Sequence, residues 1–96
     1  MMVGVCRVTL RLPENSSLKG KRQVVKSLIA RVRNRYNVSI AEIDNQDSWQ
    51  IASLGISCVS NSNGHANEVL TKVVGFIRAN RLDAEVLDWD VETVKA

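Results

Sequence analysis

The chain has 96 residues, of which 45% are apolar and 24% charged, the proportions of an ordinary globular protein. Its formal net charge of +3 hides a strong segregation, because residues 15–41 hold seven basic residues and no carboxylate, while the other residues hold six basic and ten acidic ones. No apolar run approaches the roughly 20 residues of a membrane span, and the alternating N-terminus lacks the features of a signal peptide. We therefore expect a single cytoplasmic domain over residues 1–96, with no membrane segment.

Residues 2–12 alternate between apolar and polar side chains, which predicts a half-buried strand. One face of this strand carries Cys6, Val8, Leu10 and Leu12, and the other carries Arg7, Thr9 and Arg11. A turn follows at residues 13–16. Ser16 or Ser17 is then placed to cap the N-terminus of a helix.

An amphipathic helix is expected over residues 18–36, because apolar side chains recur there with the helical period. Its apolar stripe consists of Leu18, Val25, Leu28, Ile29, Val32 and Tyr36. Along one flank of the stripe, at spacings of about three to four residues, follow Lys19, Arg22, Lys26 and Arg33. Asn37 is a typical residue to end such a helix.

The second half of the chain predicts a hairpin, a helix and a strand. Strands over residues 38–44 and 49–60 flank the polar segment 45–48, and a second amphipathic helix covers residues 66–80. The last strand, residues 84–93, is expected to turn Leu87, Trp89 and Val91 to one side and Asp88, Asp90 and Glu92 to the other.

The order β-α-β-β-α-β favours an α+β fold, the ferredoxin-like sandwich, in which an antiparallel sheet of order 4-1-3-2 carries both helices on one face. In this sheet Arg7 and Arg11 should face the acids of the last strand. Pairs of opposite charge across neighbouring strands stabilise a sheet slightly. RNA-recognition modules of this topology stack bases on outward aromatic side chains. The first and third strands have none, so a sheet that reads RNA in this way is disfavoured.

The first part of the basic segment, with Lys19, Lys21 and Arg22, lies where a helix begins and where cations are mildly unfavourable. The fold should bring a polar edge close to it, formed by Glu42, Asp44, Asp47, Trp49 and Gln50, with Arg78, Arg81 and Asp83 not far away. Two interpretations stay open. The edge is either a surface ion-pair network that offsets the cations, or a recognition edge for phosphate or a protein partner.

The second part of the segment, with Lys26, Arg31, Arg33 and Arg35, has no obvious acidic partner in its own fold. A stripe of one sign is typical of attraction to a phosphate backbone, without sequence readout. The alternative is a helix that faces solvent or the acids of a neighbouring subunit.

No catalytic constellation, metal-ligand spacing or cofactor motif is present in the sequence. His65 stands alone at a helix start, and Cys6 and Cys58 are expected to be small core thiols. A disulfide between the two cysteines would require neighbouring strands and an oxidising compartment. An enzyme or small-molecule sensor around Asp47 and Trp49 is a minor alternative.

Five segments of the chain form a recognisable combination of motifs: Met2–Val5, Ser17–Arg22 continuing to Leu28, Asn37–Asp44, Gln46–Gln50, and Leu54-Gly55 running into Val59–Asn61. Together they resemble the YlxP-like family of small bacterial proteins, a domain of unknown function. Gly20 departs from the family pattern, where glutamate is common, and makes the segment more one-signed. The resemblance implies a ferredoxin-like fold and brings no catalytic residues. The family's genes commonly lie beside those of a transcription elongation factor, a translation initiation factor and a ribosome-binding factor, which implies a role in ribosome assembly or RNA metabolism.

We therefore expect a non-enzymatic accessory protein of the ribosome or RNA machinery, with no cofactor. Phosphates of rRNA or a ribosomal subunit would contact Lys19, Lys21, Arg22, Lys26, Arg31, Arg33 and Arg35. The alternative is a protein-interaction module without nucleic-acid binding, a homodimer formed through the edge strand Val38–Ile43, which is apolar on both faces.

Overall fold

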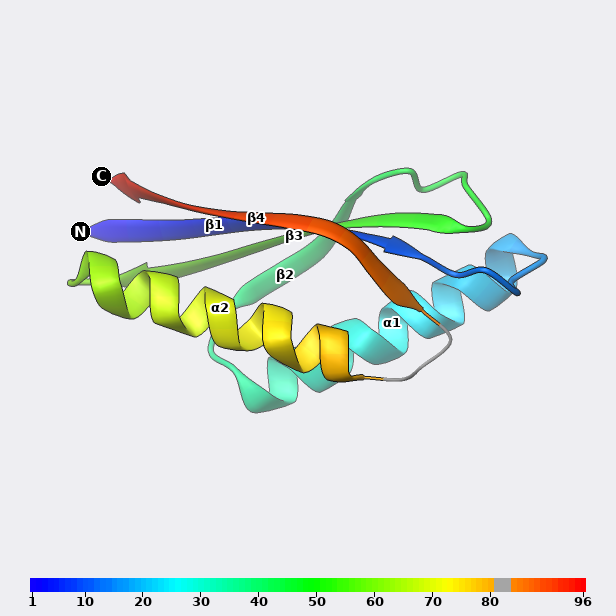
Figure 1. The fold of residues 1–96 in the computed structure, drawn as a ribbon, viewed down its shortest axis with the longest axis horizontal. Helices are drawn as coiled ribbons and strands as arrows, with labels where there is room; N and C mark the ends of the chain where they lie inside the picture. The colour runs from blue at the N-terminus through cyan, green and yellow to red at the C-terminus, as the bar shows by residue number, and fades with distance from the viewer. Residues whose placement is uncertain (81–83) are drawn as a thin grey trace.

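The computed structural model describes residues 1–80 and 84–96 as one α+β fold (Figure 1). Its elements are β1 (Met2–Arg11), α1 (Leu18–Arg35), β2 (Ser39–Asp44), β3 (Ile51–Ser60), α2 (Asn63–Ala79) and β4 (Glu85–Lys95). The strands pair antiparallel in the order β2-β3-β1-β4, which is 4-1-3-2 when read from β4. Both helices lie on the same side of the sheet, so its other face is open (Figure 1).

The core lies between the sheet and the two helices. The four apolar side chains expected inward from the first strand and its end, Cys6, Val8, Leu10 and Leu12, are at most 5% exposed, which confirms the alternation. They are covered by apolar side chains of both helices: Val25, Leu28 and Val32 of α1, and Leu70, Val73 and Ile77 of α2. The side-chain periodicity of strands and helices therefore places the core correctly.

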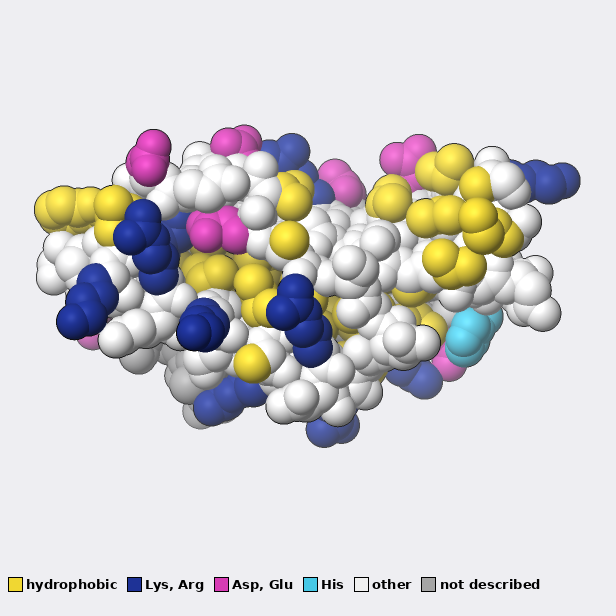
Figure 2. Space-filling view, turned by 180° about the vertical axis from the view of Figure 1, so that it is seen from behind, with side chains coloured by type: hydrophobic (Ala, Val, Ile, Leu, Met, Phe, Trp, Pro, Cys, Tyr) yellow, Lys and Arg dark blue, Asp and Glu magenta, His cyan; other side chains and the backbone are white. Residues whose placement is uncertain are grey.

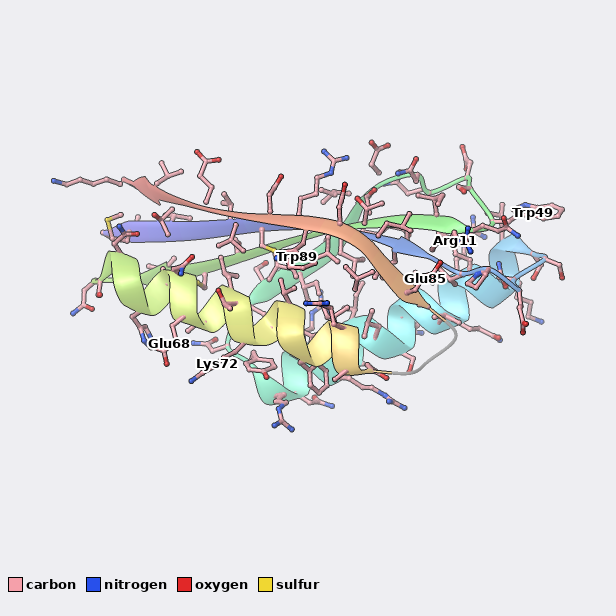
Figure 3. The ribbon with its side chains drawn as sticks, viewed as in Figure 1. Arg11, Trp49, Glu68, Lys72, Glu85 and Trp89 are labelled. Atoms are coloured by element: carbon pink, nitrogen blue, oxygen red, sulfur yellow. The ribbon has the colours of Figure 1, made fainter. Side chains whose placement is uncertain are left out.

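The prediction that Leu87 faces the core is wrong, because β4 contains an irregularity opposite β1. Thr9 pairs with Asp88 but Leu10 pairs with Val86, so Leu87 is an extra residue in the ladder. Val86 consequently packs against the core, while Leu87 is 49% exposed. Trp89 pairs with the buried Val8 and so lies on the helix side as expected, but it is 44% exposed, and its ring lies 4.7 Å from the guanidinium of Arg78 on α2 (Figure 3).

Hydroxyl side chains explain where several elements begin. Ser17 caps α1 by accepting the Gly20 N–H at 3.0 Å, and Ser62 caps α2 by accepting the His65 N–H at 3.3 Å. The Ser62 cap starts α2 at Asn63, earlier than the expected residue 66. Between β2 and β3, Ser48 Oγ accepts the Ile51 N–H at 3.0 Å. The loop is therefore longer than expected, and β3 begins at Ile51 instead of residue 49.

Both cysteines are buried free thiols, and burial together with the nearby Asp90 carboxylate raises the pKa of Cys6 to about 11. The native thiol therefore stays protonated at a pH where an exposed thiol of the unfolded chain ionises. We expect the free energy of unfolding to fall as the pH rises above about 9, with the loss continuing until the pH passes the native pKa. Urea unfolding at a series of pH values should show this fall, and Cys6→Ala should reduce it. An equal fall in the variant would contradict a contribution from Cys6.

Candidate functional site

Lys21 is a buried residue of the basic segment and does not lie on its surface. Its side chain is fully buried, its Nζ lies 2.8 Å from Glu42 Oε2, and it donates a hydrogen bond to the carbonyl of Asn45 in the hairpin. The contact with Glu42 lacks hydrogen-bond geometry, so it acts as an ion pair. A buried ammonium cannot reach a phosphate group, which removes Lys21 from the expected set of RNA contacts.

The sequence does contain a signal for this burial. Lys21 precedes Val25 by four residues and Leu28 by seven, so it continues the apolar stripe of α1 toward the N-terminus. The expected ion-pair offset of the first cations is therefore confirmed for Lys21 and Glu42, but in the interior instead of at the surface.

The expected polar edge is divided between two faces. Glu42 pairs opposite the buried Leu54 and points to the helix side, whereas Asp44 forms an ion pair with Arg7 of β1 at 3.2 Å. Asp47 is exposed in the turn, and Figure 3 shows Trp49 at the outer end of the molecule. Arg81 and Asp83, expected near this edge, lie outside the described residues.

Backbone groups of Trp49 and Gln50 instead hold the hairpin to the loop before α1. Asn15 Nδ2 donates to the carbonyls of Ser17 at 2.6 Å and Trp49 at 2.5 Å, and the Leu12 N–H donates to the Gln50 carbonyl at 2.7 Å. The geometry is possible because residue 20 is glycine, since a Cβ there would collide with Asn15 Oδ1. This part of the edge is therefore a structural clamp.

Three arginines of α1 have partners within the fold. Arg31 donates to Asn80 Oδ1 at 3.4 Å, and the guanidinium of Arg35 lies 5.3 Å from the centre of the Phe76 ring, so both face α2. Arg33 faces the opposite way and donates to the carbonyl of Ile40 on β2 at 2.9 Å. These partners are uncharged, and none of the three arginines forms an ion pair with a residue of 1–80 or 84–96, so the expected lack of an acidic partner holds for the described residues.

The side chains of Lys19, Arg22 and Lys26 are exposed and form no ion pair with any residue of 1–80 or 84–96. With Arg33 they form the row that the sequence placed on one flank of the helix, which we call the α1 row. Figure 2 shows basic side chains along this helix, with exposed apolar surface between them and the sheet.

A groove of about 490 Å³ runs between α1 and the edge strand β2. Its rim holds Arg22, Lys26 and Arg33, and its apolar lining is Val25, Ile29, Ala30, Ile40 and Ala41. Glu42 is the carboxylate that lines this groove, and Lys21 neutralises it from the interior side. The three rim cations therefore present an uncompensated positive potential above an apolar floor.

The open face of the sheet has the opposite sign. Besides the pair of Arg7 and Asp44, Arg11 pairs with Glu85 at 2.8 Å (Figure 3). The register places further acids of β4 on this face, since Asp88, Asp90 and Glu92 are the partners of Thr9, Arg7 and Val5. The predicted neighbourhood of Arg7 and Asp90 is confirmed, but the two arginines of β1 form their ion pairs with other acids. The positive and negative surfaces thus lie on opposite sides of the domain.

The part of the chain that the structure describes contains no group of three or more His, Cys, Asp or Glu side chains able to hold a metal ion. Over the same residues, neither helix combines the length and hydropathy needed to cross a bilayer.

Comparison with solved structures shows similarity of fold. The de novo designed protein Foldit4 matches over 100% of this chain and 99% of its own, with a TM-score of 0.54 and 12% identity. The apo C-terminal domain LarC2, from a cyclometallase involved in the synthesis of the NPN cofactor of lactate racemase, matches over 98% of this chain and 55% of its own, with a TM-score of 0.52 and 11% identity. At such identities the likeness concerns the fold alone.

Comparison of sequences is more specific. Over 76 residues the chain is 42% identical to the uncharacterized protein YlxP of Bacillus subtilis (strain 168), a match that covers 79% of this chain and 83% of that protein. Residues 3–91 match the family described as "Protein of unknown function (DUF503)". The chain therefore belongs to the YlxP-like DUF503 family.

Proposed function

We propose that this chain is a ferredoxin-like, non-enzymatic, cytoplasmic accessory protein that associates with RNA, such as the rRNA of a ribosomal subunit, through the α1 row. The order of its six elements and the strand order of its sheet support the ferredoxin-like assignment. The observation that carries the RNA assignment is the charge of the α1–β2 groove. Arg22, Lys26 and Arg33 line this groove, and the Glu42 carboxylate that also lines it is neutralised by Lys21.

The row is suited to contacts with phosphate and not to readout of sequence. Lysine and arginine side chains neutralise phosphates and release counterions, so affinity falls with salt concentration. Arg22 and Lys26 are one helical turn apart, a separation of about 6 Å along the helix axis. Successive phosphates of a nucleic-acid strand can therefore contact the two side chains in order.

A salt titration of binding to ribosomal subunits or purified rRNA tests this proposal. For contacts with about three phosphates, we expect the logarithm of the affinity to fall against the logarithm of salt concentration with a slope of about −2 to −3. Lys26→Glu should weaken binding about tenfold at low salt, because it places a carboxylate among the phosphates.

The matched control is Lys95→Glu, the same charge change on an exposed residue of β4. It should leave the affinity within about twofold of the parent, because Lys95 lies outside the α1 row. Absence of binding at low salt, or equal losses in the two variants, would remove the proposal.

The homodimer through Val38–Ile43 stays an alternative proposal, and one contact bears on its geometry. A second copy that adds to β2 would compete with Arg33 for the Ile40 carbonyl. Light scattering at micromolar concentration that shows a monomer would exclude such a dimer.

A further inference from the structure

The floor of the α1–β2 groove is chemically unlike its rim. Arg22, Lys26 and Arg33 stand at the rim. The lining between them and the sheet is aliphatic: Ile29, Ala30 and Ala41 are accessible, whereas Val25 and Ile40 beneath them are buried. A surface that only needed to hold phosphates would gain nothing from an exposed aliphatic floor. A ligand that fills this groove must therefore carry anionic groups at regular intervals on one side and weakly polar surface on the other.

A nucleic-acid duplex does not meet both requirements. Its minor groove exposes riboses and base edges, but its bases are paired and stacked, so no base can lay its face on the floor. In an unpaired strand the bases can turn away from the phosphates, and such strands bind in grooves that combine cations with an apolar platform. The floor lacks an aromatic side chain, so the contact with a base or ribose would be aliphatic packing.

The second wall of the groove is β2, the outermost strand of the sheet. An edge strand turns backbone N–H and C=O groups away from the sheet, where they can bind a ligand. The Ile40 carbonyl already accepts from Arg33, which fixes that guanidinium over the groove without removing its charge. Backbone groups of this kind can pair with the edges of bases.

We propose that the α1–β2 groove binds a short unpaired RNA segment, with phosphates along Arg22, Lys26 and Arg33 and at least one base or ribose on the aliphatic floor. This inference rests on the proposed function and names the form of RNA that the same site takes. An acidic protein segment is disfavoured, because it would need carboxylates repeated along one side to match three cations that a nucleotide chain matches at every phosphate.

The test compares an oligouridine of roughly ten nucleotides with the same strand annealed to oligoadenosine, by fluorescence anisotropy on the full chain. We expect the single strand to bind at least about tenfold more tightly than the duplex. Ala30→Gln places a polar amide on the floor without changing the charge of the groove or breaking the helix, and it should weaken single-strand binding several-fold, because a base can no longer pack on aliphatic carbon there.

The matched control is Ala79→Gln at an exposed alanine of α2 that does not line the groove, and this variant should bind like the parent. Equal affinity for duplex and single strand, or Ala30→Gln binding as tightly as the parent, would overturn the groove assignment while leaving RNA binding through the cations intact. Displacement of the RNA by oligoglutamate at equal charge concentration would assign the groove to an acidic protein segment and overturn it as well. If Lys26→Glu left the affinity for RNA unchanged, that result would instead contradict the proposed function itself.

Discussion

Replacing Lys21 with alanine is expected to lower the free energy of unfolding by about 3 to 5 kcal/mol, the usual cost of removing one partner of a buried ion pair. Lys21 is fully buried and Glu42 is 19% exposed, so the carboxylate left behind would be poorly solvated. The Asn45 carbonyl would also lose its donor. Urea unfolding followed by circular dichroism measures the change as a shift of the midpoint at constant m-value.

The control for this prediction is Lys19→Ala, two residues earlier, which is exposed and should cost no more than about 0.5 kcal/mol. The double variant Lys21→Met with Glu42→Leu should recover most of the loss, since an apolar pair of similar size removes both charges together. Equal costs for Lys19→Ala and Lys21→Ala would show that the ion pair does not contribute to stability.

Replacing Gly4 with valine is expected to cost about 3 kcal/mol, because side chains of α2 and β3 pack directly against this glycine of β1. A Cβ at residue 4 would lie 2.7 Å from Leu70 Cδ1 and 3.1 Å from Cys58 Sγ, so the fully buried Leu70 side chain would have to repack or the helix would have to move. Gly4→Ala should cost less, and combining it with Leu70→Ala should cost less than the sum of the two single changes. Thermal and urea unfolding of the parent, the two single variants and the double variant gives this coupling.

Gly75→Ala on α2 is the opposite case and serves as the control. A Cβ there meets no atom within 4 Å, so the change should stabilise the helix by up to about 1 kcal/mol. If Gly4→Val were no more destabilising than Gly75→Ala, the close approach of α2 would not limit the packing.

The arrangement of elements could be predicted from the sequence, because burial imposes a period on each of them. The alternation in β1 indicates that Cys6, Val8 and Leu10 face inward. The helical period of the apolar side chains likewise indicates which faces of α1 and α2 are buried. The irregularity at Leu87 could not be predicted in the same way. Two apolar residues, Val86 and Leu87, follow each other in β4, so either could face the core, and only the pairing with β1 determines which residue is extra.

The candidate site was predictable only in outline. A count of charges shows that residues 15–41 are basic, but it cannot show that Arg33 reaches a backbone carbonyl of β2 or that Arg31 reaches Asn80, since both contacts join distant segments. The groove is likewise a product of tertiary structure, because its floor combines α1 with β2. The burial of Lys21 could have been predicted from the helical period, which places it on the apolar stripe of α1. It was not predicted, because lysine side chains are usually exposed.

The separation of charge between α1 and the open face has a consequence for the kinetics of association. With the exposed cations of the α1 row on one side and the acids of β4 on the other, the domain has a dipole, and an anionic partner exerts a torque on it before contact. Encounters in which the α1–β2 groove faces the partner are therefore favoured over encounters in which the open face of the sheet does. At low ionic strength a larger fraction of collisions should therefore be productive than for a domain with the same net charge spread evenly.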